Sequence, residues 1–266
     1  MLFLRSYIPH PVAFSIGPFD VHWYGLLLGC AALLGYVIVS RLSPRFMIEK
    51  TRATDIYVSL FVGGLVGARL YHVLLQLPLY LARPFSILEI WNGGLAIHGG
   101  VIGGGLVLWY YARRYRMSFW SFADLYAIPL MIGQAIGRWG NYFNQELFGR
   151  PTDLPWGIAI QQQYRPAAHA ASPYFHPAFL YESAWNVIGA GLLLLLLLCV
   201  KKRPRGLLVW SYAAWYSLGR AMMEFVRIDT PPLLFGVRIP LVVSVVLLVA
   251  SCAMIVRLFT APVREP

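Results

Sequence analysis

Long apolar runs, separated by short polar connections, dominate the chain. About seven of them reach the length of about 20 mostly apolar residues that a helix needs to cross a bilayer. They cover roughly 21–40, 55–75, 93–112, 121–138, 178–200, 206–226 and 239–258. The only long connection, roughly 139–177, predicts a small head segment outside the membrane. We therefore predict an all-α, polytopic membrane protein in which residues 1–266 form a single domain.

The first residues differ from a cleavable signal peptide. Residues 1–20 contain one arginine, several prolines and no sufficient apolar stretch. They predict an ordered arm that lies on the membrane surface.

Composition supports the membrane assignment and changes how the charge is interpreted. The chain is 59% hydrophobic and 12% charged, whereas a soluble domain has about 25% charged residues. The net charge of +11 comes without a recognisable nucleic-acid module, so it is better explained by topology and by anionic lipid. Three cysteines lie far apart in apolar runs and predict neither a disulfide framework nor a metal site.

Basic residues gather after the odd-numbered spans, as they do in cytoplasmic loops. This predicts an outside N-terminus, a cytoplasmic C-terminus and a head segment on the outer side. The residues concerned are Arg41, Arg45, Lys50, Arg52, Arg113, Arg114, Arg116, Lys201, Lys202, Arg203, Arg205, Arg257 and Arg264.

Three arginines are not explained by orientation, because they lie in or near the outer halves of spans. They are Arg138, Arg220 and Arg227. An arginine at the centre of a membrane helix costs about 2.5–3.5 kcal/mol, so each is expected to have a partner or a function.

The richest polar motif is "GRWGNYFNQELFGR", residues 137–150. The guanidinium fork of Arg138 suits phosphate or carboxylate. Asn141 and Asn144 can donate and accept hydrogen bonds, and Glu146 could hold an arginine in place. Glycines could let the backbone turn tightly and approach a ligand; they are Gly137, Gly140 and Gly149. The alternative is a polar helix end with a snorkelling arginine.

The motif "NGGLAIHGGVIGGG", residues 92–105, places His98 near the outer start of the third span. An ionisable group at this depth is a functional candidate, and histidine can act as a general base at neutral pH. An interhelical hydrogen bond is the alternative. Gly99 with Gly103, and Gly100 with Gly104, predict close helix packing.

The motif "GRAMMEFVR", residues 219–227, spaces Arg220, Glu224 and Arg227 on one helix face. One carboxylate between two arginines leaves a positive charge for an anionic ligand, unless the three form a self-contained ion-pair ladder. In "FHPAFLYE", residues 175–182, Glu182 is expected to pair with one of the arginines. Tyr24 could hydrogen-bond a lipid headgroup or serve as an interfacial aromatic anchor.

Taken together, these residues indicate an enzyme or binder of anionic phospholipid at the outer leaflet. Zinc-protease, serine-hydrolase and Walker A motifs are absent from the sequence, and no metal or organic cofactor is expected.

The motifs "FSIGP…WYG", "GGLAIHGG", "GRWGNYFNQELFGR", "HPAFLYE" and "GRAMMEFVR" occur in the order found in the prolipoprotein diacylglyceryl transferases of bacterial inner membranes. The chain resembles this family over nearly its whole length. It departs from the family pattern in its short outer segment and in "GVRIPLVVS", which lacks an expected glutamine.

The resemblance implies a multi-pass protein of the bacterial inner membrane. Its activity would move the diacylglyceryl group of phosphatidylglycerol to the lipobox cysteine of a preprolipoprotein and release glycerol phosphate. Arg138 would bind the lipid phosphate and Arg220 would support the leaving group or the thiolate. The other implied roles are thiol base for His98, headgroup contact for Tyr24, site shaping or substrate binding for Asn141, Asn144, Glu146 and Gly149, and orientation of the network for Glu182, Glu224 and Arg227.

Two questions stay open at the level of sequence. His98 could take the thiol proton, or arginines could lower the thiol pKa and leave His98 to orient groups. The chain could also be a binder or carrier of anionic phospholipid without transferase activity. An anion channel and a headgroup transferase fit less well, because the membrane cations are biased outward and no cytoplasmic carboxylate cluster is present.

Overall fold

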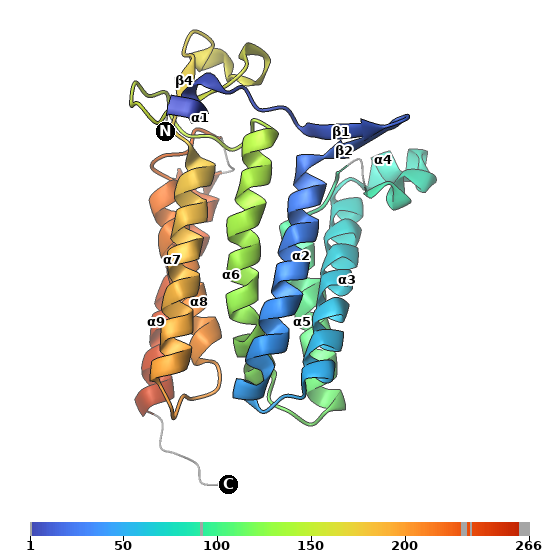
Figure 1. Ribbon diagram of the computed structural model, residues 1–266, viewed down its shortest axis with the longest axis vertical. Coiled ribbons are helices and arrows are strands. Elements are labelled where there is room, and N and C mark those ends of the chain that lie inside the picture. Colours follow the sequence, from blue (N-terminus) through green and yellow to red (C-terminus); the bar gives the residue numbers. More distant parts are fainter. Residues whose placement is uncertain (1, 91–92, 230–232, 235, 261–266) are drawn as a thin grey trace. The chain divides into compact units, whose positions relative to one another are not determined.

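Each predicted apolar run contains a helix in the computed structural model, which describes residues 2–90, 93–229, 233–234 and 236–260 (Figure 1). Asn92 and Arg264 lie outside the described residues. The long helices are α2 (Trp23–Leu42), α3 (Lys50–Leu75), α5 (Ile97–Arg114), α6 (Phe119–Phe143), α7 (Ala178–Cys199), α8 (Leu207–Met223) and α9 (Ile239–Thr260).

Five helical segments within the described residues are long and apolar enough to cross a membrane. They are Trp23–Phe46, Lys50–Leu75, Phe119–Phe143, Ala178–Cys199 and Ile239–Thr260. Helix α5 is only 18 residues long and rich in glycine, and α8 has 17 residues. The protein is therefore a mostly helical, polytopic membrane protein, while the number of seven spans stays a prediction.

Short elements add to the expected all-helical fold. The described part of the chain contains three two-stranded antiparallel sheets. They are β1 (Val12–Ile16) with β2 (Phe19–His22), β3 (Ile158–Ala159) with β4 (Tyr174–Phe175), and β5 (Leu233–Leu234) with β6 (Val237–Arg238). The short helices are α1 (Leu2–Ser6), α4 (Leu77–Ala82), and the 3₁₀ turns Ser43–Phe46, Pro84–Leu88, Gln162–Tyr164 and Ala167–His169. The predicted arm, residues 1–20, thus holds α1 and most of the β1–β2 hairpin.

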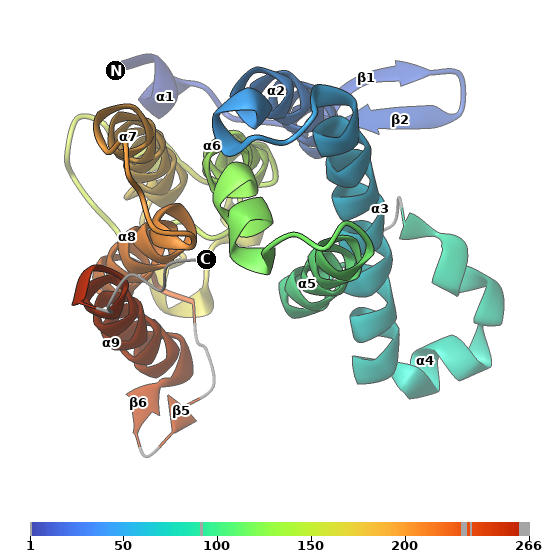
Figure 2. The same ribbon diagram turned by 90° about the horizontal axis from the view of Figure 1, so that it is seen from below.

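The chain forms two compact units, residues 36–126 and residues 1–35 with 127–266. In the first of these, α3 and α5 lie side by side (Figure 2). Glycines of one helix pack against glycines of the other. A side chain on Gly67 would lie 3.0 Å from the Cα atom of Gly103 and would also collide with the carbonyl of Gly99. The predicted packing role of Gly99 and Gly103 is confirmed, because only glycine lets two helix backbones approach so closely.

In the other unit, paired tryptophans join α7 to α8. Trp185 Nε1 donates to the carbonyl of Trp215 at 3.0 Å, and Trp215 Nε1 donates to that of Trp185 at 2.9 Å. The indoles stack with ring centroids 4.2 Å apart. A buried cluster of Tyr142, Phe148, Ile158, Ile160, Phe175 and Phe179 then packs the end of α6 and the start of α7 against the head segment. The C-terminal end of α6 and the N-terminal end of α7 therefore lie together.

Candidate active site

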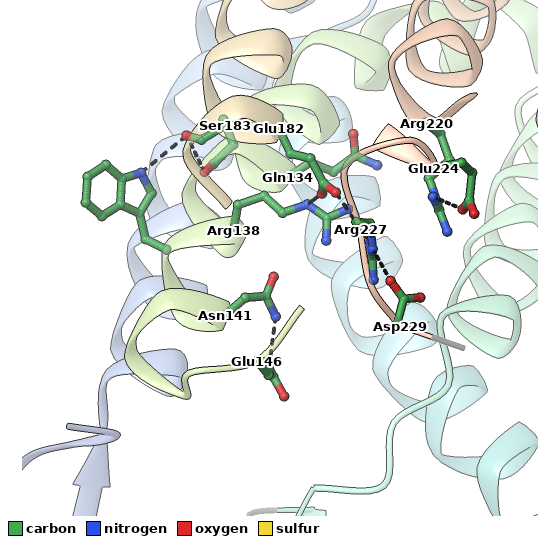
Figure 3. Close-up of polar contacts among 12 residues, drawn as sticks. Gln134, Arg138, Asn141, Glu146, Glu182, Ser183, Arg220, Glu224, Arg227 and Asp229 are labelled. Atoms are coloured by element: carbon green, nitrogen blue, oxygen red, sulfur yellow. Dashed lines mark hydrogen bonds and ion pairs between the residues drawn. The ribbon is translucent and has the colours of Figure 1, made fainter. Parts of the chain in front are cut away.

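The central feature of the site is a buried carboxylate between two arginines. Glu182, in the second turn of α7, pairs through Oε2 with Nε of Arg138 from α6 (Figure 3). Its Oε1 lies 3.3 Å from Nη1 of Arg227. Glu182 and Arg227 are both buried. The prediction that Glu182 pairs with an arginine is confirmed, and it pairs with two.

Trp139 and Ser183, which follow Arg138 and Glu182 in the sequence, connect α6 to α7. Trp139 Nε1 donates to Oγ of Ser183 at 3.2 Å, and Ser183 Oγ donates to the carbonyl of Ala135 at 2.9 Å. These bonds fix α7 against α6 one residue away from the ion pair. Arg138 was expected at the end of a span near 138, but α6 continues to Phe143, so the arginine lies within a helix.

The second ion pair of the site is Arg220 with Glu224, so these two residues lie on the same side of the helix as predicted. The expected single helix face through Arg227 is wrong, because α8 ends at Met223 and a turn follows. Arg227 instead forms a β-bridge with Gly149 and lies 2.8 Å, through Nε, from Oδ1 of Asp229. The turn changes the direction of the side chain, so Arg227 reaches Glu182 and Asp229.

Opposing effects set the ionisation of the Arg227–Asp229 pair. Burial disfavours the charge on Asp229, but the hydrogen bond from Arg227 and the nearby arginine charges hold the pKa of this carboxyl below its ordinary value. Burial likewise opposes the charge on Arg227, while Asp229 and Glu182 raise the pKa of the guanidinium above its ordinary value. Both groups are therefore charged at neutral pH.

The carboxylate of Glu146 binds two asparagines, whereas the sequence suggested that it could hold an arginine in place. Oε1 of Glu146 accepts from Nδ2 of Asn141 at 2.8 Å and from Nδ2 of Asn144 at 3.4 Å. The tight turn after α6 uses Gln145 and Leu147, with φ values of 53° and 55°. Non-glycine residues seldom adopt this conformation. Gln145 is held there because its side chain bonds the carbonyl of Pro9 at 2.9 Å and the amide of Gln161 at 2.7 Å.

Two glycines of this motif, Gly140 and Gly149, pack against other residues. Gly137 and Gly140 lie inside α6 and make no turn. A side chain on Gly140 would collide with the ring of Tyr24, which is the second residue of α2 and partly exposed. A side chain on Gly149 would lie 2.7 Å from Cβ of His176. Tyr24 is therefore placed beside α6.

A cavity of about 260 Å³ opens between α6, α7 and α8. Three predicted site residues, Arg138, Glu182 and Arg220, line it together, although they come from different helices. The remaining lining residues are Tyr181, Trp185, Asn186, Tyr216, Gly219, Met222, Met223 and Val226. The cavity thus combines two guanidinium groups with aromatic and apolar walls, which suits the polar end of a lipid.

His98 belongs to the other unit and is the second residue of α5. Its ring centroid lies 5.9 Å from that of Tyr71 on α3. The helix starts later than the predicted residue 93, because Gly93 and Gly94 adopt φ values of 85° and 73°. Its proximity to the arginines stays a prediction.

Two arginines were missed by the sequence-based assignment. Arg69, in the C-terminal third of α3, is buried and donates to backbone carbonyls of Ser86, Ile87, Glu89, Gly93 and Gly94. Its position inside a predicted apolar span was a signal that could have revealed it. Arg238, at the end of β6, has its Nε atom 2.9 Å from Oε2 of Glu224. No signal in the sequence distinguished it from other basic residues near span ends.

The fold and the site together define a class of protein. It is a polytopic helical membrane protein with an arginine-lined cavity at the ends of its helices. A family model described as prolipoprotein diacylglyceryl transferase matches residues 11–257. The chain belongs to the prolipoprotein diacylglyceryl transferase family, as its motifs predicted.

Several relatives named phosphatidylglycerol–prolipoprotein diacylglyceryl transferase are similar to the chain. The one from Synechococcus elongatus is 44% identical over 251 residues, which cover 92% of this chain and 86% of the relative. The one from Synechocystis sp. is 39% identical over 256 residues, covering 94% and 90%. The one from Prochlorococcus marinus is 36% identical over 290 residues, covering 100% and 96%.

Proposed function

We propose that this protein transfers the sn-1,2-diacylglyceryl group of phosphatidylglycerol to the thiol of a lipobox cysteine in a preprolipoprotein. A carbon–sulfur bond forms at the glyceryl carbon while the bond from that carbon to the phosphate oxygen breaks. The phosphate oxygen keeps the electron pair, so glycerol phosphate leaves, and the thiol gives up its proton. The observation that carries the proposal is the joint lining of one cavity by Arg138 and Arg220, in a chain of this family.

The contacts of Arg138 and Arg220 indicate a separate role for each arginine. Arg138 is held by Glu182 through one nitrogen, which leaves the rest of its fork for the lipid phosphate. Arg220, held by Glu224, faces the same cavity and would stabilise the charge that develops on the leaving phosphate. Glu182, Glu224 and Arg227 orient these two groups.

The remaining candidates surround this pair. Asn141, Asn144 and Glu146 form one hydrogen-bonded group that would shape the headgroup site, with Tyr24 beside it. Gly149 would support the site through its bridge to Arg227. We assign His98 as the base that takes the thiol proton. The whole chain would work as one domain.

We place the reaction at the outer leaflet of the bacterial inner membrane. Seven spans, an outer N-terminus and a cytoplasmic C-terminus would put the ends of α6 and α8 and the head segment on the outer side. The distribution of basic residues supports this orientation.

The test follows the mass of a lipobox peptide mixed with phosphatidylglycerol and the purified protein in detergent. We expect a gain equal to one diacylglyceryl group, absent with Arg138→Ala and with a cysteine-free peptide. Arg52→Ala is the control, since Arg52 contacts Glu49 at 3.8 Å and the ring of Tyr115 at 4.4 Å, and none of these residues lines the cavity. Tight lipid binding by the wild type without any gain in peptide mass would indicate a phospholipid binder or carrier instead.

A further inference from the structure

Arg238 uses all three of its side-chain nitrogens on one short segment, residues 224–229. Its Nε lies 2.9 Å from Oε2 of Glu224, and its Nη1 donates to the backbone carbonyl of Glu224 at 2.8 Å. Its Nη2 donates to the backbone carbonyl of Asp229. Arg238 therefore fixes both ends of the turn that follows α8.

Two chains of ion pairs and hydrogen bonds connect this arginine to the cavity. In the first chain, Glu224 binds Arg238 through Oε2 and Arg220 through Oε1. Arg220 lines the cavity, whereas Arg238 is not among the lining residues. Arg238 thus reaches the cavity through a shared carboxylate, which is the most buried group of the three.

The second chain starts at the backbone of Asp229. The carboxylate of Asp229 binds Arg227, Arg227 binds Glu182, and Glu182 binds Arg138. Arg138 lines the same cavity. Within the described residues, Arg238 is the residue from which both chains start, one ending on Arg220 and the other on Arg138.

Arg238 also determines the charge of this ion-paired cluster. Four guanidinium groups, those of Arg138, Arg220, Arg227 and Arg238, face the carboxylates of Glu182, Glu224 and Asp229. One positive charge remains, and without Arg238 the cluster would be neutral. A phosphodiester carries one negative charge, and a single unbalanced charge acts strongly where water is scarce.

We propose that Arg238 is a positioning residue for the transfer reaction, one that holds Arg220 through Glu224 and supplies the surplus charge that attracts the lipid phosphate. This inference rests on the proposed function. It differs from the roles of Arg138 and Arg220 because Arg238 acts without touching substrate.

Two substitutions separate the charge from the geometry. Arg238→Gln removes both, so we expect the KM for phosphatidylglycerol to rise about tenfold and kcat to fall about tenfold. Arg238→Lys keeps the charge but loses the planar fork. We expect its KM to stay within about twofold of the wild type while kcat falls about as much as in the glutamine variant.

The matched control is Arg165→Gln. Arg165 is also partly buried and donates to backbone carbonyls, those of Ile160 and Ala170, but it takes no part in the ion-paired cluster. We expect its KM for phosphatidylglycerol to equal that of the wild type. All kinetics are measured well below the thermal midpoint of each variant.

Coupling to Glu224 tests the route of the effect. In a Glu224→Gln background, adding Arg238→Gln should lower kcat by no more than about twofold, because the shared contact is already lost. Independent, multiplying losses of kcat would overturn the proposal, as would wild-type kinetics in Arg238→Gln or an equal rise of KM in the lysine and glutamine variants. If Arg238→Gln does not fold, the kcat of Arg238→Lys is compared in the wild-type and Glu224→Gln backgrounds instead.

The wild type serves as the reference for the proposed function. Absence of peptide modification by the wild type would reject the transferase activity. The affinity for phosphatidylglycerol, measured by titration of the purified protein in detergent, would then still compare Arg238→Gln with the wild type. Equal affinities would overturn the charge argument on its own.

Discussion

Arg227 and Glu182 lie 45 residues apart in sequence, yet Nη1 of the arginine is 3.3 Å from Oε1 of the carboxylate, with both side chains buried. The other oxygen of Glu182 binds Arg138. One carboxylate thus bridges two arginines from distant parts of the sequence, with one oxygen on each.

Replacing Glu182 should therefore damage both stability and activity. Glu182→Gln keeps the shape but leaves two arginines without their shared counter-charge, so we expect a loss of about 3 kcal/mol in the free energy of unfolding. We also expect a large fall in kcat/KM, because Arg138 loses its orientation. Unfolding in mixed micelles and the peptide assay measure the two effects. Glu49→Gln, which breaks an exposed pair, should cost less than about 1 kcal/mol.

The contact between Gly140 and Tyr24 predicts a difference between two glycines of one helix. Gly140→Ala would force its methyl group into the tyrosine ring and should cost about 1–3 kcal/mol. Gly137, one turn earlier in α6, has open space around its Cα atom. Gly137→Ala should be neutral or stabilising by up to about 1 kcal/mol. The thermal midpoints of the two variants measure this difference. Equal midpoints would contradict the close contact between Gly140 and Tyr24.

His98→Gln tests the assigned base. If His98 takes the thiol proton, kcat should fall by about 10²–10⁴-fold with little change in the KM for lipid. The pH–rate profile of the variant should also lose the limb that reports the base. Near-normal turnover would leave His98 as an orienting group and assign thiol activation to the arginines.

Arg69 should contribute strongly to the stability of its own unit, residues 36–126. Its guanidinium donates to five backbone carbonyls between Ser86 and Gly94, just before the helix that carries His98. Arg69→Lys has fewer donors and should lose about 3 kcal/mol in unfolding free energy. Amide exchange near Ala96 should become faster. Arg83→Lys, an exposed residue in the same segment, is the control and should change neither quantity.

The lowered pKa of Asp229 predicts a dependence of stability on pH. Its folded-state pKa lies below the unfolded value of about 3.9, so the folded state binds fewer protons. The stabilisation is complete above the unfolded pKa and is lost as pH falls through the folded pKa. Asp229→Asn should therefore lower the thermal midpoint at neutral pH, and the gap from the wild type should narrow below about pH 4. A gap that stays constant down to pH 2 would contradict this origin.

Much of the helical framework was predictable from the chain alone. The runs at 178–200 and 239–258 correspond to α7 and α9 almost residue for residue, because a long apolar stretch has few alternatives to a helix in a membrane. The predicted helix boundaries were wrong where the local backbone conformation delays the start of a helix or ends it early. Gly93 and Gly94 delay the start of α5, and the turn after Met223 ends α8 before Arg227.

The sequence by itself determined which side chains are costly in a membrane, and therefore that Arg138, Arg220 and Glu182 required an explanation. The tertiary structure alone decided their partners. It brought Arg227 to Glu182, Arg238 to Glu224, and the ring of Tyr24 to Gly140. The physical reason is distance along the chain. The length of an apolar run and the cost of burying a charge are properties of a short segment, whereas an ion pair depends on where distant segments meet in space.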